Sequence, residues 1–195
     1  MTGAEAASRV LRANGIYDVR IEKIGGNLTD HYDPKAKVIR LSDAVHDSVS
    51  TAAIGVAAHE AGHAVQHAQN YAPVKIRTAI VPITNIGSKL AIPLVFIGIL
   101  LSYVGEQYAY IAYAGVAAFG LCVLFQLVTL PTEFNASRRA LVAIEQCGIL
   151  SRDELEGSKK VLTAAALTYV AALAVTLMQF LRLFLMVAGS GNRKR

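Results

Sequence analysis

Residues 58–68 read AHEAGHAVQHA, with two histidines four positions apart and a glutamate directly after the first. On an α-helix, residues four apart lie one turn above each other, so His59 and His63 project from one face and can share a tetrahedral metal ion. Burying three such polar side chains in an alanine-rich helix without a metal would be costly. The HExxH pattern therefore predicts a zinc site, with His59 and His63 as ligands and Glu60 as the catalytic base.

Three long apolar segments follow this motif. The chain of 195 residues is 54% hydrophobic, which is high for a soluble protein. Residues 80–104 are mostly apolar and residues 108–130 carry no charge, and a run of about twenty such residues can span a bilayer. Only GEQ separates these two runs, so we expect a transmembrane helical hairpin over 80–130. A C-terminal membrane helix is expected over 161–188, although this segment contains Gln179 and Arg182.

Lysine and arginine lie on one side of the predicted hairpin. Lys75 and Arg77 precede it, GEQ has no basic residue, and the segment after it carries Arg138, Arg139, Lys159 and Lys160. Both flanks are therefore expected in the cytoplasm. If the third segment also spans, the basic tail 189–195 ends outside, which the preference of basic residues for the cytoplasm disfavours. Either that helix lies partly in the membrane interface, or the charge of the tail is too small to determine the orientation. The net charge of +5 is scattered, which favours the lipid bilayer as a partner and argues against nucleic acid.

The N-terminal part mixes helical and strand patterns. Residues 2–15 start at a capping Thr2 and keep apolar residues at helical spacing, which predicts a short amphipathic helix. VRIEKI at 19–24 and KVIRL at 37–41 alternate apolar and charged residues, which predicts a β-hairpin or two nearby strands. Residues 44–70 should then run helically through HExxH. The expected fold is a mainly α membrane protein with a zincin-like α+β catalytic part over residues 1–79.

Catalytic zinc needs a third protein ligand and one open position for water. His67 is excluded because eight residues rise roughly 12 Å along a helix, whereas metal–nitrogen bonds are near 2 Å. The HExxHxxGxxH arrangement fails because Gln66 and Gln69 occupy its further positions. A distant carboxylate remains, and Glu133 should open a helix over 131–160 as the chain leaves the membrane. The other candidates lie in the external turn or in a charged, solvated stretch: Glu106, Glu145, Glu154 and Glu156.

HEAGHAVQHAQNYAP, LTDHYDP, LVTLPTEFNASRRAL and AALTYVAAL together resemble the YugP-type neutral zinc metallopeptidases of bacterial membranes, over nearly the whole chain. These proteins are grouped with the gluzincins, whose third ligand is a glutamate in a helix reading roughly ExxAD. The resemblance implies that Glu133 is that ligand and Ala136 the matching alanine, while Ser137 stands in place of the aspartate. It also implies one Zn²⁺ per chain and a multi-pass protein of the bacterial cytoplasmic membrane. Family members usually begin with a further membrane helix, absent before Met1, so a shortened form is expected.

The predicted activity is that of a zinc-dependent metalloendopeptidase acting on protein or peptide substrates at the cytoplasmic membrane face. Glu60 would take a proton from the attacking water and pass it to the leaving amine. His31, Tyr32 and Arg138 are candidates for stabilising the transition state, with ordinary loop or helix-surface hydrogen bonding as the alternative. The strand at 37–41 could offer an edge on which an extended substrate adds.

Two other classes of function remain as alternatives. A non-proteolytic membrane scaffold or chaperone-like binding protein would keep a structural zinc ion but would not need Glu60. A channel or transporter requires polar residues along its spans, and the hairpin has almost none.

Cys122 and Cys147 form no recognisable pair and are expected to serve packing. The substrate and the oligomeric state cannot be read from the sequence.

Overall fold

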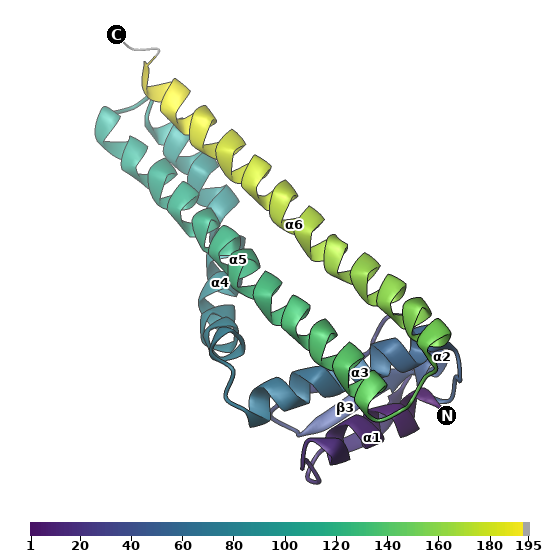
Figure 1. The fold of residues 1–195 in the computed structure, drawn as a ribbon. Coiled ribbons are helices and arrows are strands. Elements are labelled where there is room, and N and C mark those ends of the chain that lie inside the picture. The colour runs from purple at the N-terminus through teal and green to yellow at the C-terminus, as the bar shows by residue number, and fades with distance from the viewer. Residues whose placement is uncertain (193–195) are drawn as a thin grey trace. The chain divides into compact units, whose positions relative to one another are not determined.

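The structure is a computed structural model that describes residues 1–192, and the side chains of residues 1–190. In chain order its elements are α1 (Gly3–Ala13), β1 (Arg20–Ile24), β2 (His31–Asp33), β3 (Val38–Ser42), α2 (Asp43–His46), α3 (Thr51–Ala68), α4 (Ala72–Leu101), η1 (Glu106–Tyr108), α5 (Ala109–Gln146) and α6 (Arg152–Asn192) (Figure 1). The prediction of a mainly helical protein with a small sheet is confirmed. Of the predicted basic tail, residues 193–195 lie outside the described residues.

The first helix, α1, forms as its end signals predict. The Thr2 hydroxyl accepts a hydrogen bond from the Glu5 amide at 3.2 Å, and the Glu5 carboxylate accepts one from the Thr2 amide at 2.8 Å. This reciprocal pair satisfies two amides that the first turn cannot satisfy itself. Gly15 follows the helix with φ of 71°, a left-handed conformation that glycine adopts without strain. Buried residues of α1, including Ala7 and Val10, join the core around α3.

The sheet differs from the predicted hairpin. Its strand order is β1-β3-β2, and β1 pairs parallel with β3. Of the two alternatives predicted for residues 19–24 and 37–41, the hairpin is therefore wrong and two nearby strands are confirmed. Asp33 Oδ1 accepts from the amides of Lys35 and Ala36 at 2.9 and 3.1 Å, which closes a tight turn directly before β3. The antiparallel partner of β3 is therefore the segment just before that turn, β2. Because β3 is the central strand, the substrate edge predicted at 37–41 is also wrong.

The motif helix α3 is shorter than the predicted 44–70. A separate short helix, α2, precedes it, and the Ser50 hydroxyl caps α3 by accepting from the Ala53 amide at 3.2 Å. Glycine and alanine allow other helices to approach α3 closely. A Cβ atom on Gly55 would lie 3.2 Å from Ser158 of α6, and one on Gly62 only 2.7 Å from the Ala136 carbonyl oxygen of α5. Gly55 and Gly62 thus let α6 and α5 approach α3 closely.

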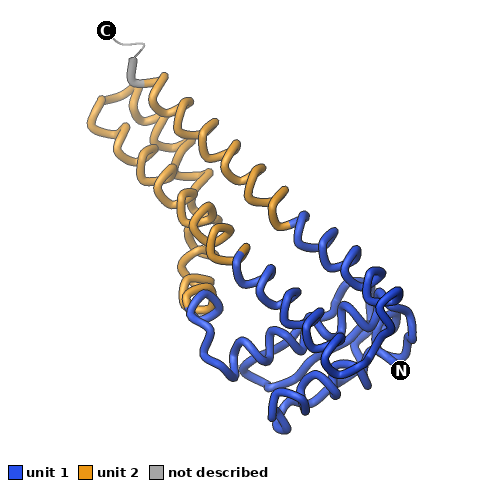
Figure 2. The backbone as a smooth tube through the Cα atoms, viewed as in Figure 1, with its two compact units in different colours: residues 1–75, 131–168 blue, residues 76–130, 169–195 orange. Residues whose placement is uncertain are grey.

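The chain divides into two compact units (Figure 2). Unit 1 comprises residues 1–75 and 131–168, and unit 2 comprises residues 76–130 and the chain from residue 169. The core of unit 1 is built on α1, β3, α3 and the parts of α5 and α6 within it, with Ile39, Leu41, Ile54 and Ile144 fully or almost fully buried. Every predicted site residue lies in unit 1. The finer domain ranges expected from the sequence stay a prediction.

Within the described residues, three helical segments are long and apolar enough to cross a membrane, judged by length and composition: Ala72–Leu101, Glu106–Gln146 and Arg152–Ser190. Their exposed apolar side chains in unit 2 include Phe96, Leu100, Leu124, Val175 and Leu185. α5 runs without a break through Pro131, so the prediction that Glu133 opens a new helix is wrong. A proline removes one backbone donor, and apolar helices often continue through one.

Candidate metal centre

Two histidines of α3 and one glutamate of α5 converge inside unit 1. His59 Nε2 lies 3.2 Å from Glu133 Oε2, and His63 Nε2 lies 3.5 Å from the same oxygen. The two imidazole rings meet edge to face with their centroids 4.7 Å apart. One donor atom from each residue lies within 4.8 Å of the other two. This set of two imidazoles and a carboxylate suits a zinc ion, which takes nitrogen and oxygen ligands.

Close helix contact makes this convergence possible. Gly62 lies between the two histidines in sequence, and Ala136 lies one turn after Glu133 on α5. Ala136 is fully buried, and its carbonyl oxygen would lie 2.7 Å from a Cβ atom on Gly62. A side chain at position 62 would push the two helices apart, so Gly62 lets the donor atoms of α3 and α5 come within reach of one ion.

The outer nitrogen of each histidine ring also has a partner. His59 Nδ1 lies 3.0 Å from Ser137 Oγ, and His63 Nδ1 lies 3.0 Å from Gln66 Oε1. When Nδ1 carries the proton and donates to an oxygen, the Nε2 lone pair is left for a cation. Ser137, at the position where the resemblance to the gluzincins led us to expect an aspartate, reaches His59 with its hydroxyl.

The site is electronegative. Burial of His63 acts to lower its pKa, but the hydrogen bond to Glu133 and the charges of Glu60 and Glu133 outweigh it and raise the pKa above its ordinary value. The same two carboxylates favour a metal cation for the same electrostatic reason. Glu60 is 9% exposed. Among the residues that the structure describes, its carboxylate has no hydrogen-bonding partner.

The structure does not gather the other predicted residues in the same way. His31 in β2 donates from Nδ1 to the Thr29 carbonyl oxygen at 2.7 Å, and its Nε2 lies 3.3 Å from the Arg40 guanidinium. The Tyr32 ring packs against His67, with ring centroids 5.6 Å apart, one turn of α3 beyond His63. Arg138 is exposed on α5 and is one of the residues that line a cavity of about 360 Å³ between α5 and α6. Their roles in the transition state stay predictions.

The remaining carboxylates do not join the cluster. Glu145, Glu154 and Glu156 are exposed on helices, and Glu154 accepts from the Ser151 amide at 2.9 Å, which caps α6. Glu106 begins η1 in unit 2. The contact of Gln66 with the candidate metal centre was not predicted from the sequence, because this residue was considered only as a mismatch to the HExxHxxGxxH motif. Gln66 lies three residues after His63, on the same face of the helix, and this spacing could have indicated the contact.

Comparison with known proteins agrees with this geometry. Residues 1–188 match a family described as "putative neutral zinc metallopeptidase". A relative from Bacillus subtilis (strain 168), named "putative membrane protease YugP", is 47% identical over 195 residues, which cover 98% of this chain and 82% of the relative. No solved structure matches the chain. The family matches almost the whole chain, and the resemblance drawn from its motifs is confirmed: the chain belongs to this family of neutral zinc metallopeptidases.

Proposed function

We propose that the protein is a membrane-embedded zinc metalloendopeptidase that hydrolyses protein or peptide substrates at the cytoplasmic face of the bacterial cytoplasmic membrane. His59, His63 and Glu133 would hold one zinc ion per chain. The observation that supports this most directly is the approach of both Nε2 atoms to one buried carboxylate oxygen, at 3.2 and 3.5 Å. When bound, zinc supplies an acidified water and a Lewis acid that polarises the scissile carbonyl.

Glu60 is the proposed general base and acid. It precedes the buried Ala61 on α3 and directly follows the ligand His59, so its carboxylate belongs to the same part of the helix. Its negative charge helps to raise the pKa of His63, which supports a role for Glu60 next to the proposed ligands. A carboxylate in this position can remove a proton from the attacking water and later deliver that proton to the leaving amine nitrogen.

The substrate would bind along the sheet. With β3 in the centre, the edge strand on the side of α3 is β2, and Tyr32 of β2 contacts His67 of α3. An extended peptide that adds to β2 would pair with its backbone and lie across the helix that carries the metal ligands. Tyr32, whose ring contacts α3, and His31 of the same strand stay candidates for stabilising the charge that develops on the reacting carbonyl.

Metal analysis tests the proposal directly. The purified protein should contain one zinc ion per chain, and removal of that ion with a chelator should abolish peptide hydrolysis. Added zinc should restore it. A protein purified at full length without zinc, and active in the presence of chelator, would overturn the proposed function. Stoichiometric zinc in a protein that cleaves no member of a diverse peptide library would favour the scaffold alternative.

Thiol labelling tests the proposed orientation. In a protein with Cys122 and Cys147 replaced by alanine, a cysteine at Gly105 should react with an impermeant reagent added to intact cells. A cysteine at Asn70 should react only after the cells are opened, because the basic segments flanking the first two candidate spans favour the cytoplasm. Both positions lie outside the long helices, at Gly105 before η1 and at Asn70 after α3. The reverse labelling pattern would place the metal centre outside the cell.

A further inference from the structure

Gln66 is a completely buried polar residue beside the metal centre. Its side chain is 0% exposed, and it bridges α3 to α5. Its Nε2 donates to the Thr132 carbonyl oxygen at 2.8 Å and to Asn135 Oδ1 at 3.0 Å, while Oε1 lies 3.0 Å from His63 Nδ1. Both donor hydrogens and the acceptor oxygen are thus engaged. A buried amide bonded in this way is held in one orientation, because any other leaves polar atoms without partners.

The partners decide which way the amide faces. A backbone carbonyl can only accept, so the nitrogen of Gln66 must point to Thr132 and its oxygen must point to His63. An amide oxygen also only accepts, so His63 Nδ1 must carry a proton and donate it. In the neutral form of the His63 ring, Nε2 is then the unprotonated nitrogen, and it is the atom 3.5 Å from Glu133 Oε2. The direction of one amide therefore sets which nitrogen of His63 can bind a metal.

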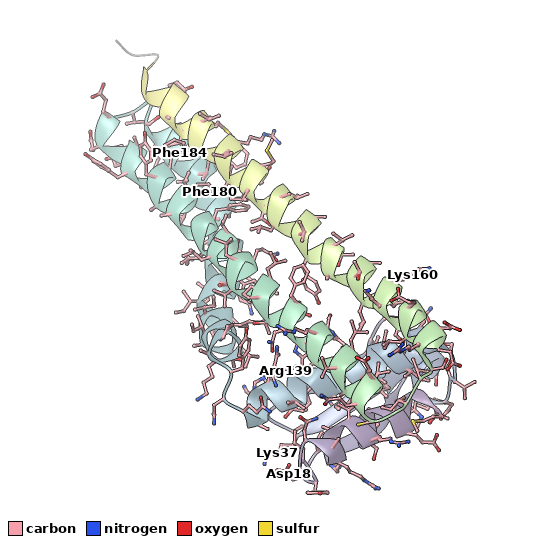
Figure 3. All side chains as sticks on the ribbon, in the orientation of Figure 1. Asp18, Lys37, Arg139, Lys160, Phe180 and Phe184 are labelled. Atoms are coloured by element: carbon pink, nitrogen blue, oxygen red, sulfur yellow. The ribbon has the colours of Figure 1, made fainter. Side chains whose placement is uncertain are left out.

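The hydrogen bonds that run from His63 through Gln66 to Asn135 end at a half-buried arginine, Arg139. Arg139 of α5, labelled in Figure 3, donates from Nε to Asn135 Oδ1 at 2.6 Å and from Nη1 to Gln69 Oε1 at 2.6 Å. Its guanidinium carbon also lies 5.8 Å from the centre of the Tyr71 ring. A guanidinium donates only and keeps its charge, so Asn135 must turn its oxygen toward Arg139 and Gln66.

His59 is held differently. Its Nδ1 contacts the Ser137 hydroxyl at 3.0 Å, and a hydroxyl can rotate to donate or to accept. Ser137 is therefore compatible with either neutral form of His59. The two ligands on α3 differ in this respect, since only His63 faces a partner whose hydrogen-bonding direction is fixed by further contacts.

We propose that Arg139, Asn135 and Gln66 form a directional hydrogen-bond relay that holds His63 in its Nδ1–H form and so prepares Nε2 for zinc. Gln66 is the positioning residue of this relay. The inference rests on the proposed function for the identity of the metal. The tautomer of His63 in the metal-free protein can nevertheless be measured without any enzymatic assay.

Gln66→Met tests the relay, because methionine has a similar length and flexibility but cannot form these hydrogen bonds. In metal-free protein at alkaline pH, nitrogen NMR of labelled histidine should find His63 protonated at Nδ1 in the parent and substantially at Nε2 in the variant. Zinc affinity, measured by competition with a chromophoric chelator, should fall roughly 10- to 100-fold. Gln146→Met, at an exposed glutamine ending α5, is the matched control and should change neither quantity.

Arg139→Met provides a second test that does not touch His63 directly. It should shift the His63 tautomer toward Nε2–H and should weaken zinc binding less than Gln66→Met does. Arg139→Lys keeps a cation that only donates, so it should restore part of the Nδ1–H tautomer and part of the zinc affinity. These two variants also test the relay if Gln66→Met does not fold. A folded Gln66→Met protein with His63 still protonated at Nδ1 and with parental zinc affinity would overturn the relay. A parent that binds zinc but hydrolyses nothing would overturn the peptidase proposal alone.

Discussion

A Glu60→Gln protein is expected to bind as much zinc as the parent and to lose peptide hydrolysis by roughly 10²- to 10⁴-fold, the usual contribution of general acid–base catalysis. Glutamine keeps the size of the side chain but cannot accept the proton of the attacking water. All three proposed ligands, His59, His63 and Glu133, stay in place. Metal content measured alongside turnover of a substrate found in a peptide library separates the loss of the base from the loss of the ion.

The matched control is Glu156→Gln, the same change at an exposed residue of α6 that pairs with Lys159 at 3.3 Å. Surface ion pairs of this kind contribute little, so this protein should keep both its zinc and its turnover. Turnover of Glu60→Gln equal to that of the parent would remove Glu60 from the mechanism. It would also reopen the scaffold alternative for the zinc ion, because a binding protein does not need this carboxylate.

The histidine pair of α3 could be predicted from local sequence, whereas its partner on α5 could not. His59, Glu60 and His63 follow from the helical period alone. Glu133 lies 74 positions after His59 and was reached through the expected hairpin and the match to ExxA. Its local setting was misjudged, since Glu133 was expected to open a new helix, whereas the structure continues one helix of 38 residues through Pro131. Single prolines do not always end an apolar helix, and local pattern alone cannot tell which ones do.

The sheet shows a similar limit. β1 and β3 were recognised from alternating side chains, but β2 has only three residues, too few for an alternating pattern to stand out. The turn made by Asp33 decides which segment lies antiparallel to β3, and this contact is local enough to be expected from Asp-Pro. The parallel pairing of β1 with β3 depends on the path of the loop between β1 and β2, for which the sequence offers no clear signal.

Gln66 illustrates what local sequence omits at a site. A glutamine in an alanine-rich helix is noticeable, but its partners Thr132 and Asn135 are 66 and 69 positions away. Only the contact of α3 with α5 shows that the amide is buried and directed toward His63. Ser137 is a second example. The resemblance to the gluzincins led us to expect an aspartate at this position, and the structure shows a hydroxyl at hydrogen-bonding distance from His59.

The replacement of Glu133 by alanine is expected to abolish hydrolysis and to weaken zinc binding by more than the roughly 10- to 100-fold that follows loss of a hydrogen-bonding partner of a ligand. Two histidines of one helix bind zinc modestly, and a carboxylate from a second helix completes three-point coordination while one position stays open for water. Glu133 is 2% exposed, and its Oε2 is the atom that both Nε2 nitrogens approach. Zinc competition and peptide turnover measure the two effects separately.

Alanine at Glu145 is the control for removing a carboxylate from α5, and alanine at His67 is the control for removing a histidine from α3. Both proteins should keep most of their zinc, because Glu145 is exposed and His67 packs against Tyr32 one turn beyond the proposed ligand His63. Glu133→Asp sharpens the test, since it retains a carboxylate on a shorter side chain and should bind zinc with intermediate affinity. If Glu133→Ala purifies with full zinc while His67→Ala does not, the third ligand lies on α3, and the carboxylate of α5 only accepts hydrogen bonds from the two imidazoles.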